Sequence, residues 1–355
     1  MSQIMSPTVQ GGRRRLDASV PPEYDVPTRE PRIESPRTVR LIIGAMIGLW
    51  ILGIAGAGTA VVAVGAPSWF QRPAAGLLMV VFAVGLIHRG GGHMRIWLPI
   101  TAALSVAAVV LETNLLLASA ASVTAVLGAV WAVLVTRPAD SVVGSVREYV
   151  LSLVVALSGT LAVAAWNAPV NYQRFNLLVI AIALGLAITL VWNLGAGLHG
   201  LGKQNLAILA GVAVLLLVLL AYSSFVRTHG SQTIVDAFSD LVAWMRQNVK
   251  GVPRPVEVFI GFPALIVGVS LRSKRREGWW VLVFAVLGTA VLSTSLVTPG
   301  AFPSYIGLST LYSAILGLAV GLVARHYAMR QGSARAARAI EQVVRVEPPR
   351  FAPLK

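Results

Sequence analysis

The stretch that decides the fold is residues 206–221, LAILAGVAVLLLVLLA, which contains no charged residue, no amide and one glycine. With the neighbouring residues 222–225, the run reaches the roughly 20 residues that an α-helix needs to cross a bilayer. Lys203 precedes this run, and residues 227–254 behind it form the longest polar interval between two apolar runs. We therefore predict a transmembrane helix whose two flanks orient the rest of the chain.

The overall composition extends this conclusion to the whole chain. Of its 355 residues, 56% are hydrophobic and 12% are charged, whereas an ordinary soluble domain has about 25% charged residues. So much apolar surface requires lipid as the solvent for most of the chain. The sequence therefore predicts an all-α, polytopic integral membrane protein.

The charge distribution indicates how this protein faces the membrane. The formal net charge is +15, and the basic residues come in short groups between apolar runs. This pattern is typical of cytoplasmic loops that obey the positive-inside rule, and it argues against a nucleic-acid partner. Arginine outnumbers lysine 25 to 4, which indicates a GC-rich bacterial genome and hence the inner membrane as the location.

Ten apolar runs are predicted to cross the membrane. Residues 96–136 must fold back at residues 112–114, because at about 1.5 Å per residue they are too long for one crossing of roughly 30 Å. Alternation from a cytoplasmic start leaves both termini inside, with 23 of the 29 basic residues on that side. The predicted spans are 41–65, 74–88, 96–111, 115–136, 149–166, 176–197, 206–221, 256–271, 279–297 and 305–327.

The membrane domain, residues 41–328, is flanked by two predicted cytoplasmic tails. Residues 1–40 are rich in proline and mixed charge, which is typical of disorder. Residues 329–355 are basic, and their alanine-rich part, residues 333–345, is expected either to prolong the last helix or to lie on anionic lipids. On the opposite side, apolar residues at helical spacing predict an amphipathic helix at about residues 231–250, which either lies on lipid or caps the bundle.

Polar residues near or inside the spans are the candidates for a substrate path. The acids lie in tails, loops or span ends, with Glu148 and Glu257 near their spans. Glu112, in the tight hairpin, is the preferred proton or cation site. Asn193 is a candidate for a buried amide, and span nine has the densest group of hydroxyls. The predicted lining residues are Glu112, Asn193, Thr289, Ser293 and Thr294.

Glycines at helical spacing and the histidines are the remaining candidates for packing or metal-binding residues. Glycines at GxxxG spacing, which allow helices to approach closely in lipid, are predicted packing residues: Gly44, Gly48, Gly317 and Gly321. Four of the five histidines fall on the predicted cytoplasmic side, but no cysteine or carboxylate pattern accompanies them, so we predict no metal site. No cofactor motif and no catalytic set is visible in the sequence.

Two function classes follow from these features. The first is a permease-like transporter of a small or lipid-like molecule, built as five plus five spans of opposite orientation. The lack of acids in the predicted membrane interior argues against proton coupling in such a transporter. The alternative is a non-catalytic subunit or scaffold of a cell-envelope assembly, bound to another membrane protein or to a second copy. The sequence favours a non-enzymatic protein, and a membrane-embedded transferase is the third possibility.

Overall fold

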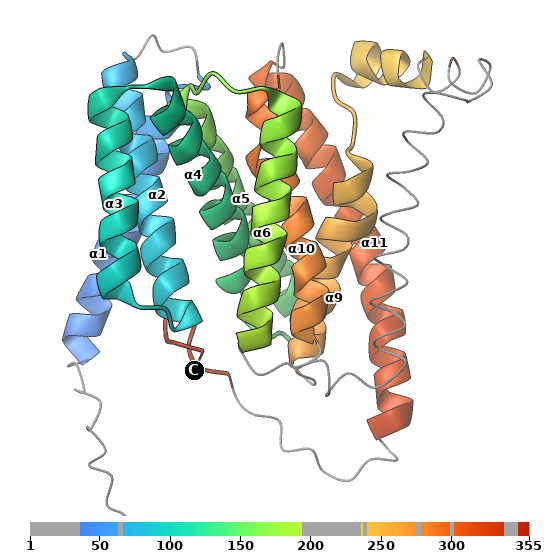
Figure 1. Ribbon diagram of the computed structural model, residues 1–355. Coiled ribbons are helices and arrows are strands. Elements are labelled where there is room, and N and C mark those ends of the chain that lie inside the picture. The colour runs from blue at the N-terminus through green and yellow to red at the C-terminus, as the bar shows by residue number, and fades with distance from the viewer. Residues whose placement is uncertain are drawn as a thin grey trace, which may run out of the picture. The chain divides into compact units, whose positions relative to one another are not determined.

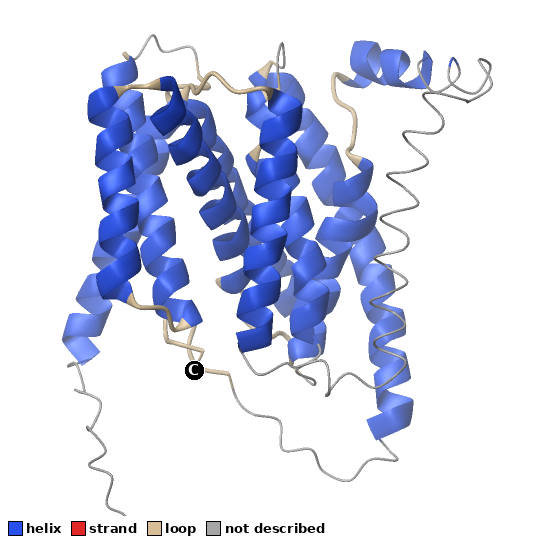
Figure 2. Ribbon diagram, viewed as in Figure 1, coloured by secondary structure: helices blue, strands red, loops and turns tan. Residues whose placement is uncertain are grey.

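The computed structural model describes residues 36–62, 67–193, 236, 240–273, 278–298, 302–336 and 347–354. Within these residues, the secondary structure is helical and contains no strand (Figure 2). Eight of the described helices are long and apolar enough to cross a membrane. The predicted fold class, an all-α polytopic membrane protein, is therefore confirmed.

The eight candidate spans run side by side along the bundle (Figure 1). Between α6 and α10, and again after α10, the described chain forms shorter helical pieces. These pieces are η2 (Met245–Val249), η3 (Glu257–Gly261), α9 (Phe262–Arg272) and η4 (Ser295–Val297). The candidate spans are α1 (Pro36–Gly58), α2 (Ser68–Gly90), α3 (Met94–Leu111), α4 (Asn114–Leu134), α5 (Val142–Trp166), α6 (Tyr172–Asn193), α10 (Gly278–Ser293) and α11 (Pro303–Ala336).

Eight of the ten predicted spans coincide with these eight helices. Predicted span 256–271 is divided between the π-helix η3 and the α-helix α9. The cause is Pro263 near the start of α9, because a proline has no N–H with which to continue a regular helix from the preceding turn. Residues 206–221 lie outside the described residues, so the count of ten spans stays a prediction.

Local signals in the sequence fix several helix ends. The chain folds back between α3 and α4 as predicted, and Glu112 there takes a left-handed conformation with φ of 49°. The Thr113 side chain then caps α4 by accepting the Leu116 N–H. Ser141 caps α5 in the same way by accepting the Gly144 N–H. Such caps satisfy N–H groups that the first turn of a helix leaves unpaired.

The core of the bundle lies among α4, α5, α9 and α10, whereas α1 and α3 are mostly exposed. Small residues bring these core helices into backbone contact. A Cβ on Gly128 of α4 would lie 3.3 Å from the Gly159 Cα of α5, and a Cβ on Gly261 would lie 2.4 Å from the Gly288 Cα of α10. Lipid tails solvate apolar side chains as favourably as a protein interior does, so the hydrophobic effect does not drive the helices together inside the membrane. The close packing of the helices therefore stabilises the bundle.

The predicted amphipathic helix is described only in part, at Asp236 and from Asp240 onward. Leu241 and Trp244 are exposed there, and the Arg246 guanidinium lies over the Tyr305 ring at 5.8 Å from its centroid. Apolar side chains that no helix covers fit either a lipid surface or a partner, so the choice between these two roles stays open.

Candidate functional sites

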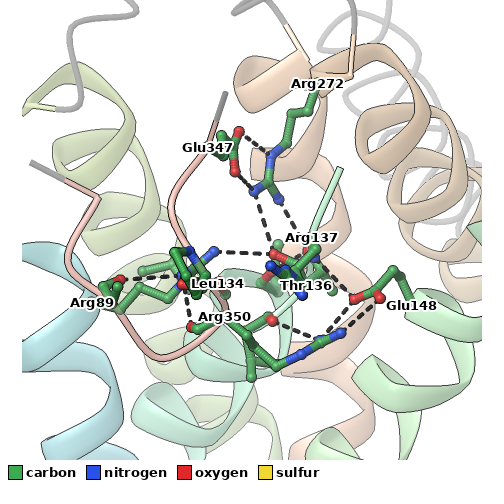
Figure 3. A network of polar contacts seen from close by, with 12 residues as sticks. Arg89, Leu134, Thr136, Arg137, Glu148, Arg272, Glu347 and Arg350 are labelled. Carbon is green, nitrogen blue, oxygen red and sulfur yellow. Dashed lines mark hydrogen bonds and ion pairs between the residues drawn. The ribbon is translucent and has the colours of Figure 1, made fainter. Parts of the chain in front are cut away.

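A network of buried arginines and glutamates forms the first site (Figure 3). It lies at the end of the bundle where α2, α4 and α9 end and α5 begins. We call this end the arginine end. The C-terminal segment, residues 347–354, returns to the bundle there and contacts these helices. The sequence predicts these residues to be part of the basic tail 329–355, and the structure shows that they contact the helices of the bundle.

Arg89, in the last turn of α2, is fully buried. Its Nε donates to the Leu134 carbonyl at 2.6 Å and its Nη2 to the Thr136 carbonyl at 3.4 Å. Its Nη1 donates to three carbonyls of the C-terminal segment, those of Pro349, Arg350 and Ala352. Among the described residues, all of its acceptors are carbonyl oxygens, so no carboxylate bonds to this charge.

Arg272, at the end of α9, is the second buried guanidinium. It lies over the Trp279 ring at 3.8 Å from its centroid, in cation–π geometry. Its Nε and Nη2 both donate to the Glu347 carboxylate, the former at 3.1 Å. Its Nη1 and Nη2 also donate to the Thr136 hydroxyl and carbonyl. Arg89 and Arg272 therefore share the Thr136 carbonyl.

Glu148, in the second turn of α5, is the buried carboxylate of this network. Arg350 donates to its two oxygens from Nη1 and Nη2, each at 2.7 Å. The Arg137 backbone N–H donates to Oε2 at 2.9 Å, and the exposed Arg147 side chain donates to Oε1. Bidentate pairs of this kind are among the strongest polar contacts in proteins. They tie the C-terminal segment to α5.

The second site lies at the opposite end of α9, where the chain enters the bundle without helical structure. Residues 251–254 run along α11, and hydroxyls of α11 satisfy their backbone groups. The Val252 N–H donates to the Ser309 hydroxyl at 3.0 Å, and the Arg254 N–H donates to that of Ser313 at 2.8 Å. Non-helical backbone at membrane depth is tolerated where protein groups replace water as partners.

Glu257, the first residue of η3, follows this segment and is fully buried. Its Oε1 pairs with the Arg254 guanidinium, which also bonds to the Thr310 hydroxyl. Its Oε2 has no hydrogen-bond partner among the described residues. Its carbonyl oxygen lies 3.3 Å from the position that a Cβ on Gly317 would take. Gly317 lies about 21 Å from the start of α11 at Pro303, at 1.5 Å per residue. Glu257 is therefore deep in the bundle.

This depth corrects the sequence analysis, which placed Glu257 at the outer end of its span and no acid in the membrane interior. The prediction was a helical span over residues 256–271, kinked at Pro263, with Glu257 at its outer end. Because residues 251–254 enter the bundle as non-helical chain, the helical stretch begins inside the bundle, at Pro255, and Glu257 lies far from that surface.

Polar groups from α5 and α11 surround Glu257. Tyr149 of α5 donates its hydroxyl to the Ala314 carbonyl at 2.8 Å and packs edge-on against Phe262. Ser313 lies near the Glu257 carboxyl. One turn from Tyr149, the buried Ser152 hydroxyl has no partner among the described residues. The site thus combines a carboxylate, a guanidinium and several hydroxyls inside an apolar bundle.

The five predicted lining residues lie apart from both sites, and Glu112 and Asn193 also lie apart from the three hydroxyl residues Thr289, Ser293 and Thr294. Glu112 is half exposed at the α3–α4 hairpin and pairs with Arg72 at 2.6 Å. Asn193 is the exposed last residue of α6. Thr289 and Thr294 are buried and bond to the Ala129 carbonyl and the Asn176 side chain. Ser293 bonds to the Thr289 carbonyl within its own helix. The hydroxyls of Thr289 and Ser293 in α10 and of Thr294 just after it thus serve helix packing in this conformation.

The four predicted packing glycines divide into two pairs. A Cβ on Gly317 would lie 2.7 Å from the Phe262 Cβ, and one on Gly321 would lie 2.6 Å from Ile266 Cδ1. These two glycines let α11 approach α9. Gly44 and Gly48 face open space instead, so their small-residue face is available to lipid or to another protein.

Sequence reasoning missed Arg89, Arg272 and Arg350 as site residues. It treated all three as ordinary loop or tail charges, because nothing near them in the chain distinguishes a buried arginine from an exposed one. Their partners lie far away in sequence: 260 residues separate Arg89 from Pro349 and 202 separate Glu148 from Arg350.

Comparison with known proteins adds no further constraint. No protein-family model matches the chain, and no curated protein and no solved structure is significantly similar to it. Its function must therefore be inferred from the geometry of the two sites.

Proposed function

We propose that the protein is a permease-like transporter that carries a small or lipid-like molecule across the cell membrane. The observation that supports this proposal is Glu257, a fully buried carboxylate with one oxygen lacking a partner among the described residues. An ionisable group inside a membrane protein is costly, and such groups usually mark pathways for ions or substrates.

The backbone around Glu257 supports the same proposal. Transporter sites are typically built on interrupted helices near the middle of the bilayer, where unwound backbone supplies polar groups. Residues 251–254 supply such non-helical backbone where the chain enters the bundle, and η3 behind them is a π-helix, a form that is frequent at functional sites. Glu257 joins these two elements and thus lies where a substrate would bind.

Site-directed labelling tests this proposal directly, because the chain has no cysteine and one introduced thiol is then unique. Ser313→Cys places the thiol beside the Arg254–Glu257 pair. A matched control, Leu311→Cys, places it on the exposed side of the same helix. A membrane-impermeant maleimide is applied to right-side-out and to inside-out vesicles, with full labelling after denaturation as the reference.

A transporter exposes its site to each side in turn, so we expect the Ser313→Cys thiol to react in both vesicle preparations. The Leu311→Cys thiol faces lipid and should react in neither. If the Ser313→Cys thiol reacts from neither side although it reacts fully after denaturation, the transport proposal is wrong. A static bundle would then favour the alternative, a scaffold subunit of an envelope assembly.

A further inference from the structure

The arginine end holds more buried positive charge than the described residues neutralise. The network contains the guanidinium groups of Arg89, Arg272 and Arg350 and the carboxylates of Glu148 and Glu347 (Figure 3). Arg350 pairs with Glu148, and Arg272 pairs with Glu347. In the part of the chain that the structure describes, Arg89 bonds to carbonyl oxygens alone. Because Arg89 and Arg272 donate to the same Thr136 carbonyl, the uncompensated guanidinium lies directly beside the second one.

The C-terminal segment supplies most of the acceptors for these two arginines. Glu347 provides the only carboxylate bonded to Arg272 among the described residues, and the carbonyl groups of Pro349, Arg350 and Ala352 in the segment accept from Arg89 Nη1. All of them belong to non-helical chain and not to the bundle. Without the segment, the acceptors left for the two side chains would be Leu134 and Thr136.

From this arrangement we propose that Arg89 and Arg272 form a binding site for an anionic group of the phosphate class, which Glu347 occupies as an internal competitor. Arginine presents a planar fork of donors that matches phosphate oxygens. The Glu347 carboxylate has two oxygens and, within the described part of the chain, bonds to Arg272 alone. A phosphate group has three or four oxygens and more charge, so it can bond to both guanidinium groups together.

The helices hold this site open for such a ligand. Arg272 is fixed from behind by the Trp279 ring, and its Nη1 is held by the Thr136 hydroxyl. Arg89 is fixed by the Leu134 carbonyl. Both side chains therefore keep their positions when the C-terminal segment leaves. Glu148 retains the Arg147 side chain and the Arg137 N–H in that event, so it does not draw either arginine away.

The first experiment measures binding of inorganic phosphate, by equilibrium dialysis with a radioactive label, to the full chain in detergent. The variant Glu347→Gln removes the competing charge and keeps the shape of the side chain. Glu112→Gln removes the same charge at a carboxylate in the distant α3–α4 hairpin, paired with Arg72, and is the matched control. We expect Glu347→Gln to bind phosphate at least tenfold more tightly than the wild type, and Glu112→Gln to match the wild type.

A second arm distinguishes a soluble ligand from a lipid headgroup. The same variants are placed in nanodiscs of phosphatidylcholine with or without phosphatidic acid, and bound lipid is counted by native mass spectrometry. Retention of phosphatidic acid by Glu347→Gln without phosphate binding assigns the site to lipid, and the reverse result assigns it to a soluble phosphate compound. In either arm, adding Arg272→Gln to Glu347→Gln should abolish the gain.

A measurement on the unmodified chain does not depend on how the variants fold. Because the ligand and Glu347 compete, phosphate or phosphatidic acid should accelerate cleavage of the wild-type C-terminal segment by chymotrypsin. If neither ligand binds Glu347→Gln more tightly than the wild type, or if the gain survives Arg272→Gln, the proposal is overturned. Unchanged cleavage of the wild type at saturating concentrations of both ligands overturns it as well.

Discussion

Replacing Arg350 with alanine removes three hydrogen bonds that hold the C-terminal segment. These are the two bonds to the Glu148 carboxylate, each at 2.7 Å, and one to the Val135 carbonyl at 2.9 Å. The backbone of residue 350 keeps its bond to Arg89. The variant therefore isolates the contribution of one guanidinium to docking.

The size of the effect follows from burial. Glu148 is fully buried and the Arg350 side chain is 19% exposed. Removing one partner of a fully buried ion pair costs about 3–5 kcal/mol. Glu148 keeps the Arg137 N–H and the Arg147 side chain, so we expect a smaller loss of about 2 kcal/mol, of the order of one or two bonds to a charged group. This corresponds to a roughly 30-fold larger undocked population, since 1.4 kcal/mol is a factor of ten.

Chymotrypsin cleavage after Phe351, followed by mass spectrometry on the native protein in detergent, reports this population. When docking is fast relative to cleavage, the cleavage rate follows the undocked fraction. Arg147→Ala is the matched control, because it removes the other arginine on the same carboxylate. That side chain is 70% exposed, and exposed pairs contribute about 0–1 kcal/mol. Equal cleavage rates for the two variants would refute the argument from burial.

Two further substitutions test the packing of the bundle by thermal unfolding in detergent. Gly288→Ala should destabilise the protein by about 1–3 kcal/mol, because its Cβ would lie 2.8 Å from the Gly261 Cα; Gly44→Ala, which meets open space, should not destabilise it. Trp166→Phe should cost about 1–3 kcal/mol, because it breaks a buried 2.9 Å bond from the indole N–H to a hydroxyl of α4. Trp69→Phe, at a 71% exposed ring, should stay within about 0.5 kcal/mol of the wild type.

The membrane class and most helix positions could be read from the sequence because they depend on local properties. An apolar run of about 20 residues has one stable solution in lipid, a helix that satisfies its own backbone. The hairpin at Glu112 follows from length alone, since residues 96–136 exceed one crossing. Residues 256–271 are helical as well, and near Pro263 the π-helix η3 passes into the α-helix α9.

The candidate sites were beyond sequence reasoning for a different reason. Spacing rules connect residues within one or two helical turns, whereas Arg89 bonds to carbonyls of residues 349–352. Glu257 owes its depth to hydroxyls of α11, more than fifty residues away, that accept from the backbone of Val252 and Arg254. The chosen acid, Glu112, carries the same carboxyl group, but its hairpin leaves it half exposed.

The sequence by itself determined that this is a membrane protein and that its chain is built of apolar helices. The free energy of transferring an apolar segment from water to hydrocarbon depends on the side chains that it contains and not on their neighbours in the fold. Only the tertiary structure decided which charges are buried. A guanidinium or carboxylate can leave water only where partners surround it, and those partners come from distant helices and from the C-terminal segment.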